Sequence, residues 1–367
     1  MKEHIFVRDI IRLIEDFAPL SLQEDYDNAG LICGDPAAEI HSILLSTDIT
    51  EEVIDEAIAG GHDLIVSHHP LTLQGIKNLV PDTYVKRCLI KSIRNNLNIY
   101  SAHTNMDAVA GGVSGRMADK LGLLQQRVLQ PSGKLYSLQC YVPVSFAGKV
   151  REAIFSCDAG HIGNYDSCSF NSQGEGTFRA LEKARPYAGQ VGEHHTEAET
   201  KIEITVPAYL LQKSIQALIE AHPYEEPVWN VVCLNNVNPV TGFGIIGELP
   251  SPAGSQAFLQ QVKDTFGCQV IRHTALCKPQ IRKVAVCGGS GAFLTRAAIA
   301  AQADIYISGD YKYHDFINAG NKLIIADIGH YESEQFTKEI FYELVRKKLS
   351  NFAVQFSKVR TNPINYF

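Results

Sequence analysis

The sequence predicts an α/β protein in which a discontinuous metal-binding domain is interrupted by an inserted domain. In residues 41–127, strand-like and helix-like patterns alternate along the chain. This alternation changes near Pro131 and returns after residues 235–239. A chain of 367 residues with 45% hydrophobic residues is also longer than one ordinary small domain and has ample material for two cores.

The first segment predicts a largely parallel sheet. Strands are expected at 42–46, 64–66 and 98–102, and helices at 51–59, 84–95 and 114–121. Strands that alternate with helices imply right-handed crossovers between parallel neighbours.

The middle segment has a different order. Strands are expected at 135–142, 201–206 and 228–234, two strand-like pieces at 167–170 and 176–180, and helices at 150–156 and 209–221. The order βαββαβ is that of the ferredoxin-like split unit. Residues 189–199 are polar and are expected to form a loop, so His194 and His195 are not expected to be ligands. The predicted inserted domain is 128–243.

The last segment repeats the first rhythm. Strands are expected at 284–287, 305–308 and 323–327, with a helix at 293–301 and another from Tyr331 onward. The predicted outer domain therefore comprises 1–127 and 244–367. Its two segments share a strand-helix order, which suggests pseudo-related halves.

Composition and charge narrow the class of protein. The net charge is 33 minus 40, or −7, which argues against a general nucleic-acid binder. An anionic substrate stays possible because a metal can reverse the local field.

Membrane insertion and secretion are not expected. The start, Met1 to His4, leads into an amphipathic stripe rather than a continuous apolar signal peptide, and no apolar run approaches the roughly 20 residues of a membrane span. Nine cysteines without a C-x-x-C pair suggest reduced thiols and a cytoplasmic location.

Three polar clusters predict a metal centre. His68 and His69 follow the strand at 64–66, Asp107 lies in the cluster that begins at His103 after the next strand, and His330 and Glu334 follow the strand at 323–327. In an open parallel sheet, ligands collect outside the carboxyl ends of the strands. Mixed nitrogen and oxygen ligands favour two divalent ions over one closed structural zinc.

Several of these side chains have a predicted geometry. His330 and Glu334 are four residues apart and would share one helix face. His69 precedes Pro70 at a strand end, where the chain can turn so that both neighbouring imidazoles face one cavity. Asp107 has two oxygens and could bridge two ions. Asp27 and Asp48 are candidates to orient the histidines, although Asp48 could equally cap the helix near Glu51.

Three further motifs have open interpretations. Gly288, Gly289, Ser290 and Gly291 could receive an anion, such as a substrate phosphate, or form a tight turn between strand and helix. Asp310 and His314 are the candidate catalytic residues; His314 could shuttle a proton or contact phosphate, or be a solvated loop histidine. The turn 222–227, His-Pro-Tyr-Glu-Glu-Pro, could overhang a cleft or rigidly connect a helix and a strand.

The motifs together resemble a known family. They are Ser67 to Pro70, His103 to Asp107 followed by Gly111 to Val113, Gly247 to Leu249, Val286 to Gly291, Ser308 to Asp310 and Gly329 to Glu334. The chain is similar in these motifs to the Ngg-interacting-factor-three-like family, also labelled GTP cyclohydrolase I type 2. Its insert is similar to the middle domain of the longer bacterial members, itself similar to CutA and PII folds.

The resemblance implies a dinuclear site held by His68, His69, Asp107, His330 and Glu334, and a toroidal homohexamer. Many relatives have tryptophan before Asp-Asn where this chain has Tyr26, and no ligand depends on that position.

The leading functional hypothesis is a cytoplasmic dinuclear metal-dependent hydrolase with a small-molecule substrate, a nucleotide or a related phosphorylated compound. GTP cyclohydrolase chemistry is one form of it and a general phosphoesterase is another. The alternative is a non-catalytic metal-binding scaffold or regulatory interaction protein. Each subunit is expected to hold two divalent ions, zinc first, with iron, manganese or cobalt as alternatives.

Overall fold

The chain folds into two compact units, seen here in a computed structural model that describes residues 4–367. The first unit consists of residues 1–131 and 239–367, and the second of residues 132–238. Met1, Lys2 and Glu3, at the start of the predicted outer domain and its amphipathic stripe, lie outside the described residues. The strand β5 (Leu124–Pro131) pairs with β10 (Gly242–Gly254), so the first unit extends beyond 127 and resumes before 244.

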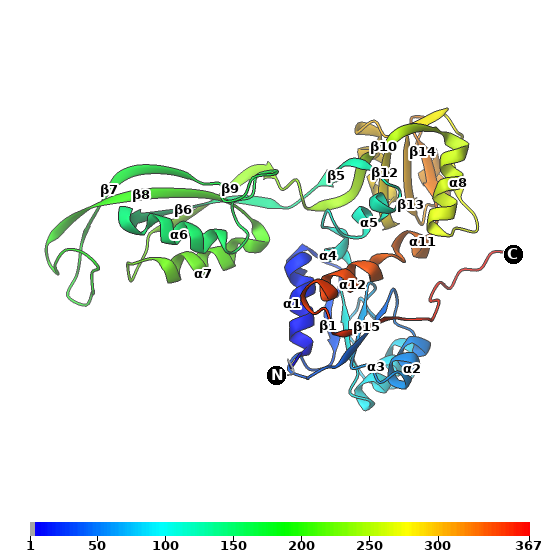
Figure 1. The fold of residues 1–367 in the computed structure, drawn as a ribbon, viewed down its shortest axis with the longest axis horizontal. Helices are drawn as coiled ribbons and strands as arrows, with labels where there is room; N and C mark the ends of the chain where they lie inside the picture. The colour runs from blue at the N-terminus through cyan, green and yellow to red at the C-terminus, as the bar shows by residue number, and fades with distance from the viewer. Residues whose placement is uncertain (1–3) are drawn as a thin grey trace. The chain divides into compact units, whose positions relative to one another are not determined.

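The first unit contains a five-stranded sheet in the order β1-β4-β3-β2-β15 (Figure 1). Its strands are β1 (Gly30–Cys33), β2 (Ser42–Ser46), β3 (Leu64–Ser67), β4 (Asn98–Ser101) and β15 (Ala353–Phe356). All neighbours are parallel except β1 and β4. The short apolar runs of β2 to β4 are buried because helices cover both faces of the sheet.

Alternate residues along the strands of this sheet pack into two different hydrophobic cores, one on each face. Ile43 packs with α1 (Val7–Phe17) and α12 (Thr337–Lys348) on one face. Leu44 packs with α2 (Glu51–Ala59) and α3 (Tyr84–Arg94) on the other. The period of two along a strand therefore determines which helices each residue meets.

A second sheet of the same unit has six strands in the order β11-β14-β13-β12-β10-β5. The further strands are β11 (Arg272–His273), β12 (Gln280–Ser290), β13 (Ile305–Gly309) and β14 (Ile324–Asp327). β12, β13 and β14 run parallel in chain order, as β2, β3 and β4 do in the first sheet. One face packs on α5 (Val113–Lys120) and α8 (Ser255–Phe266), the other on α9 (Thr295–Ala300).

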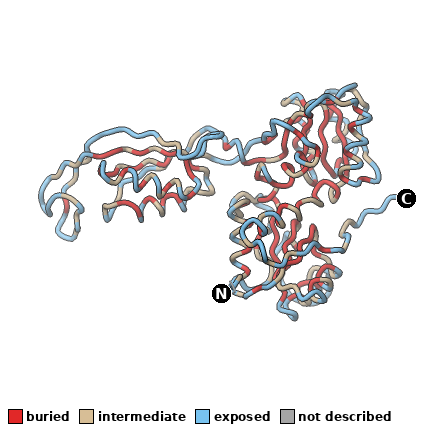
Figure 2. Tube along the Cα trace, in the orientation of Figure 1, coloured by how far each residue is buried: buried red, intermediate tan, exposed pale blue. Residues whose placement is uncertain are grey.

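The second unit has the element order βαββαβ. It contains β6 (Lys134–Pro143), α6 (Ala147–Phe155), β7 (Phe170–Arg179), β8 (His194–Pro207), α7 (Leu211–Ala221) and β9 (Trp229–Val237). The strands form an antiparallel sheet in the order β7-β8-β6-β9, and both helices pack with β6 and β8 in one core. Figure 2 shows buried residues along these strands and helices, whereas β7 is largely exposed.

Two predictions in this unit are wrong. The two strand pieces expected at 167–170 and 176–180 are the single strand β7, and the loop expected at 189–199 is partly strand, because β8 begins at His194. β7 and the start of β8 pair with each other through their backbones while most of their side chains face solvent. A hydrophobic pattern therefore gives no signal there.

The length and hydrophobicity of the helices bear on the expectation about membrane insertion. Within residues 4–367 no helix combines the length and the apolar character needed to cross a bilayer.

Candidate metal centre

The polar clusters predicted from the sequence meet at the carboxyl ends of strands in the first unit. His68 and His69 follow β3, and Asp107 ends the short helix α4 (Thr104–Asp107) that follows β4. His330 and Glu334 form the two ends of α11 (His330–Glu334) just after β14. The structure therefore brings together all five residues from three distant segments.

One part of the centre is built around the Glu334 carboxylate. Its Oε2 atom lies 2.8 Å from Nε2 of His69 and 3.0 Å from Nε2 of His330. The contact with His330 spans four residues, so the predicted sharing of one helix face is confirmed. The side chain of Glu334 is almost fully buried, with 4% exposed.

His68 forms the other part of the centre. Its Nε2 atom lies 3.6 Å from Oε1 of Glu334 and 3.8 Å from Oδ1 of Asp107. This nitrogen is buried, and it has no hydrogen-bond partner among residues 4–367. A buried polar atom without a partner is rare in a folded protein, and the chemistry of this atom fits a metal ligand.

Each histidine is oriented through its other ring nitrogen. Nδ1 of His69 lies 2.7 Å from Oδ1 of Asp48, and Nδ1 of His330 lies 2.7 Å from Oδ2 of Asp310. Nδ1 of His68 lies 2.9 Å from the carbonyl oxygen of Ala102. A carbonyl or carboxylate only accepts, so we assign the Nδ1 proton to each ring as the donor.

This assignment leaves the Nε2 lone pairs pointing into the centre. Nε2 of His69 and Nε2 of His330 lie only 3.2 Å apart, and both face the Glu334 carboxylate. Neutral imidazoles in this arrangement would place lone pairs against lone pairs. The cluster therefore needs positive charge between these atoms, supplied either by protons or by metal ions.

Protons fill this role when no ion is bound. Burial opposes protonation of His69, but the charge of Glu334 and the hydrogen bond to Asp48 outweigh it and raise its pKa to about 10. Burial likewise opposes protonation of His330, and its hydrogen bonds to Asp310 and Glu334 raise its pKa to about 11. The free cluster thus stores protons that a metal ion can displace.

The two carboxylates of the centre differ in their protonation. Burial and the nearby charge of Glu334 raise the pKa of Asp107 to about 7. Burial would also raise the pKa of Glu334, but the charges of His68 and His69 hold it well below its usual range. Asp107 is thus a carboxylate that a nearby cation would fully ionise.

The donor atoms form three overlapping groups, each with the composition of a metal site. They are His68, His69 and His103; His69, His330 and Glu334; and His68, Asp107 and Glu334, with the donor atoms of each group within 4.8 Å of one another. Three residues are shared between groups. Each of these overlapping groups of imidazole and carboxylate ligands could hold a divalent metal ion.

His103 was not among the ligands predicted from the sequence. Its ring centroid lies 5.3 Å from that of His68 and 5.4 Å from that of His69. Asp27 accepts from its Nδ1 at 2.8 Å, so this histidine is oriented like the other three. The available signal was its position two residues after β4, equivalent to that of His69 two residues after β3.

The predicted orienting carboxylates lie beside the histidines. Burial opposes ionisation of Asp27, but hydrogen bonds from His103 and Thr104 hold its pKa well below its usual range. Asp48 accepts from His69 and from the Thr361 hydroxyl. The alternative role of Asp48 as a helix cap is wrong, because the side chain of Thr50 caps α2.

Two glycines make room for the carboxylates of this region. A Cβ atom at Gly289, where φ is +60°, would lie 2.2 Å from Oε1 of Glu334. Gly329 has φ +95°, and a Cβ there would meet the carboxylate of Glu332 at 2.3 Å. Gly329 thus allows the sharp turn from β14 into α11 that presents His330.

The segment 288–291 is the end of β12 and the residue after it, rather than a free loop. The amide of Gly288 donates to Ser114 Oγ at 3.3 Å, and the amide of Gly289 donates to Ser333 Oγ at 2.9 Å. Any anion contact from this segment would fall to Ser290 or Gly291.

The two candidate catalytic residues have different surroundings. Asp310 accepts a hydrogen bond from His330, and this bond holds its pKa below the usual range despite partial burial. His314 lies exposed on the short helix α10 (Tyr313–Ile317), with its ring against Tyr313. No contact between His314 and the metal-centre residues is found in the described part of the chain.

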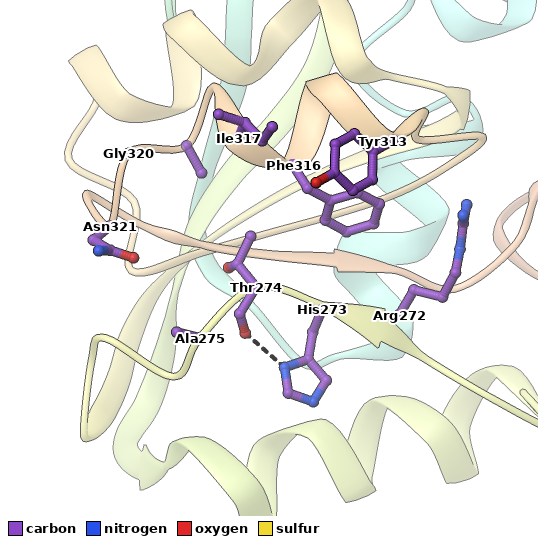
Figure 3. A pocket seen from close by; sticks show the side chains of 10 residues that line it. Arg272, His273, Thr274, Ala275, Tyr313, Phe316, Ile317, Gly320 and Asn321 are labelled. Carbon is purple, nitrogen blue, oxygen red and sulfur yellow. Dashed lines mark hydrogen bonds between the residues drawn. The ribbon is translucent and has the colours of Figure 1, made fainter.

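A separate cavity of about 520 Å³ opens between β11 and α10 (Figure 3). Arg272, Tyr313 and Phe316 line it, and the Arg272 guanidinium lies 5.5 Å from the centre of the Phe316 ring. Arg272 is also held by Asp327 and by the carbonyl oxygen of Tyr311. No ligand candidate of the metal centre is among the residues that line this cavity.

Comparison with known proteins identifies the family. The chain is 38% identical over 365 residues to a Halalkalibacterium halodurans protein named GTP cyclohydrolase 1 type 2 homolog, covering 97% of this chain and 98% of the relative. A Bacillus subtilis protein of the same name is 33% identical over 379 residues, covering all of both chains.

Solved structures agree with this result. A crystal structure of a Bacillus cereus protein related to NIF3 matches with a TM-score of 0.87 and 34% identity, covering all of both chains. The resemblance inferred from the motifs is confirmed, because the family model described as Duf34/NIF3 (NGG1p interacting factor 3) matches residues 5–363. The chain therefore belongs to the Duf34/NIF3 family.

Proposed function

We propose that this protein is a dinuclear metal-dependent hydrolase that acts on a nucleotide or a related phosphorylated compound. One observation carries the proposal: the Nε2 atoms of His68, His69 and His330 converge on the buried Glu334 carboxylate. Curated relatives bear the name GTP cyclohydrolase 1 type 2 homolog, so GTP is the first substrate to test.

In this proposal two divalent ions are held by the five residues predicted from the sequence, His68, His69, Asp107, His330 and Glu334, and by His103. Zinc is the first choice, with iron, manganese or cobalt as alternatives, because imidazole and carboxylate ligands suit all four. When bound, a pair of such ions polarises a substrate oxygen and makes water a nucleophile near neutral pH.

The chain's own residues have separate roles. Asp27, Asp48 and Asp310 accept hydrogen bonds from the Nδ1–H groups of three histidines and hold each Nε2 toward the centre. The proposal assigns to Asp310 this positioning role rather than a direct catalytic one. His314, four residues beyond Asp310, stays a proposed proton shuttle or phosphate contact, and Ser290 and Gly291 stay proposed phosphate contacts.

Metal-reconstituted protein and GTP test the reaction. Formate release, measured by a coupled assay, is expected from protein loaded with two ions and from the control variant His41→Ala, whose side chain is 78% exposed outside the cluster. Glu334→Gln is expected to lose both metal and turnover. Phosphate release without formate would instead identify a phosphoesterase.

A non-catalytic metal-binding scaffold or regulator is the second candidate. It is favoured by the second unit, which has its own core and contributes none of the metal-centre residues. We propose that this unit is a ferredoxin-like domain of the CutA/PII kind, on the basis of its βαββαβ order and sheet order. Fully metal-loaded protein that turns over no member of a nucleotide panel would favour this candidate.

The proposal also includes a cytoplasmic homohexamer. A cytoplasmic location is supported by nine cysteines that all lie free in the structure. Self-association is supported by the edge strand β9, which carries exposed apolar residues that include Trp229 and Val232. Light scattering at several concentrations is expected to give the mass of six chains.

A further inference from the structure

A second cavity of about 520 Å³ lies within the second unit, apart from every residue of the metal centre. Its walls come from β7, β8 and the His-Pro-Tyr-Glu-Glu-Pro turn at 222–227. Two kinds of side chain dominate the lining, namely aromatic rings and carboxylates. The rings are Tyr141, Phe178, Tyr187 and Tyr224, and the carboxylates are Glu175, Glu199, Glu225 and Glu226.

His222 fixes the turn rather than serving as a ligand. Its Nδ1 accepts a hydrogen bond from the Tyr224 amide at 3.1 Å, and its Nε2 donates to the Tyr141 carbonyl oxygen at 3.0 Å. Both nitrogens are therefore used in a neutral ring, and burial lowers the pKa of His222 accordingly. The consequence is a rigid position for Tyr224.

Tyr224 in turn holds Glu199. Its hydroxyl donates to Oε1 of Glu199 at 2.8 Å, and Glu199 is only 7% exposed. No lysine, arginine or histidine lies within ion-pair distance of this carboxylate among residues 4–367. The hydrogen-bond partner of this buried carboxylate is the Tyr224 hydroxyl, and a cation in the cavity would be a complementary partner for it.

A glycine on the adjacent strand makes room for the same carboxylate. A Cβ atom at Gly176 would lie 2.4 Å from Oε2 of Glu199 and 2.5 Å from its Cδ. Glu199 thus occupies space that any other residue at position 176 would fill. The carboxylate is built into the wall of the cavity and does not extend freely into solvent.

The rings complete a surface suited to a cation. The ring centroids of Tyr187 and Phe178 lie 6.0 Å and 6.1 Å from that of Tyr224. Aromatic faces attract cations, and most strongly where water is excluded. A second histidine, His195, lies against Phe178 and pairs with Glu197 at 2.9 Å.

We propose that this cavity binds a small organic cation of the alkylammonium class, with its charged group at Glu199 and its aliphatic part against the aromatic rings. The additional carboxylates at 175, 225 and 226 favour a ligand with more than one amino group. The lining contains no lysine or arginine side chain that would repel such a ligand. This binding is independent of the metal-dependent reaction.

Calorimetry on the full-length protein tests the proposal with spermidine and 1,5-diaminopentane as probes and 1,5-pentanediol as the neutral control. Saturable binding of the amines and none of the diol is expected. Glu199→Gln keeps an acceptor for Tyr224 but removes the charge, and should raise the Kd at least tenfold. The matched control Glu193→Gln removes an exposed carboxylate of the same unit that does not line the cavity, and should leave the Kd unchanged.

A second variant guards against a folding defect in the first. Gly176→Ala displaces the Glu199 carboxylate without removing any charge, and should also weaken amine binding at least tenfold. Circular dichroism checks that each variant is folded. The proposal is overturned if the diol binds as well as the amines, if no amine binds, or if Glu193→Gln weakens binding as much as Glu199→Gln does.

Discussion

Gly289 offers a way to disturb the metal centre without changing any ligand. In Gly289→Ala the new methyl group would lie 2.2 Å from Oε1 of Glu334, whereas ordinary van der Waals contact begins at 3.4 Å. The carboxylate must therefore retreat by about 1.2 Å. Metal-ligand distances tolerate only about 0.2 Å, so we expect metal affinity to fall at least about tenfold.

The backbone effect of this substitution can be separated from its effect on the site. Alanine at a positive φ costs roughly 1–2 kcal/mol of stability wherever it occurs. Gly267, which ends α8, has φ +65° and open space where a Cβ atom would lie, so Gly267→Ala carries the same strain with no contact near the centre. Both variants should unfold at a lower denaturant concentration, and only Gly289→Ala should lose metal.

The assay is competition for zinc between the protein and a chelator of known affinity, with unfolding in urea followed in parallel. The expected result is wild-type affinity in Gly267→Ala and weakened affinity in Gly289→Ala at similar stability. Equal metal affinity in both variants, within about twofold, would refute the placement of Glu334 against Gly289 and its role as a ligand.

Three further predictions concern the same unit. Asp48→Asn should weaken metal binding about 10- to 100-fold, because it weakens the hydrogen bond that orients the His69 ring. The exposed control Asp55→Asn should leave metal binding unchanged, and competition with a chelator measures the affinity of both variants. Metal affinity should rise with pH between roughly 6 and 9, because ions must displace protons from His69 and His330, whose pKa values are raised. Titration calorimetry in buffers of different ionisation enthalpy should show that metal binding releases protons. A metal affinity that does not change with pH would contradict this prediction. Replacing residues 132–238 by a short linker should preserve metal content, because this unit contributes no residue of the metal centre and Pro131 pairs with Gly242 close to the cut ends. A folded but metal-free product would contradict this.

The elements predicted most accurately from the sequence are the buried ones, because burial requires apolar residues that form a recognisable pattern. The strand β2 and the helix α2 lie where the apolar runs placed them, at 42–46 and 51–59. Strands such as β3 are buried at every position between layers of helices, so their short apolar runs stand out from the surrounding sequence.

Edge strands were not predictable in the same way. β15 is only partly buried and pairs with β2 more than 300 residues earlier in the chain, and the exposed β7 is held mainly by its pairing with β8. Such strands depend on backbone hydrogen bonds to a distant partner, and a local hydrophobic pattern contains little information about that partner.

In the metal centre, too, the features set by local sequence were predictable, and those set by contacts between distant segments were not. The position of a polar residue after an apolar strand correctly placed His68 after β3 and His330 after β14. These two strands belong to different sheets, so the meeting of the two residues does not follow from a single common edge and appears only in the folded chain. Two features of the site were not predicted, namely His103 as a further ligand candidate and Asp310 as the residue that orients His330. The first depends on the hydrogen bond between His103 and Asp27, and the second on the hydrogen bond between His330 and Asp310. Those contacts join separate segments and appear only in the folded chain.

Anomalous diffraction at the zinc edge from crystals of the zinc-loaded protein tests the central claim most directly. The account predicts two neighbouring peaks per chain, bordered by the Nε2 atoms of His68, His69 and His330 and by the Glu334 carboxylate. A single peak, or peaks at other residues with these nitrogens left facing one another, would contradict the assignment of a dinuclear metal centre.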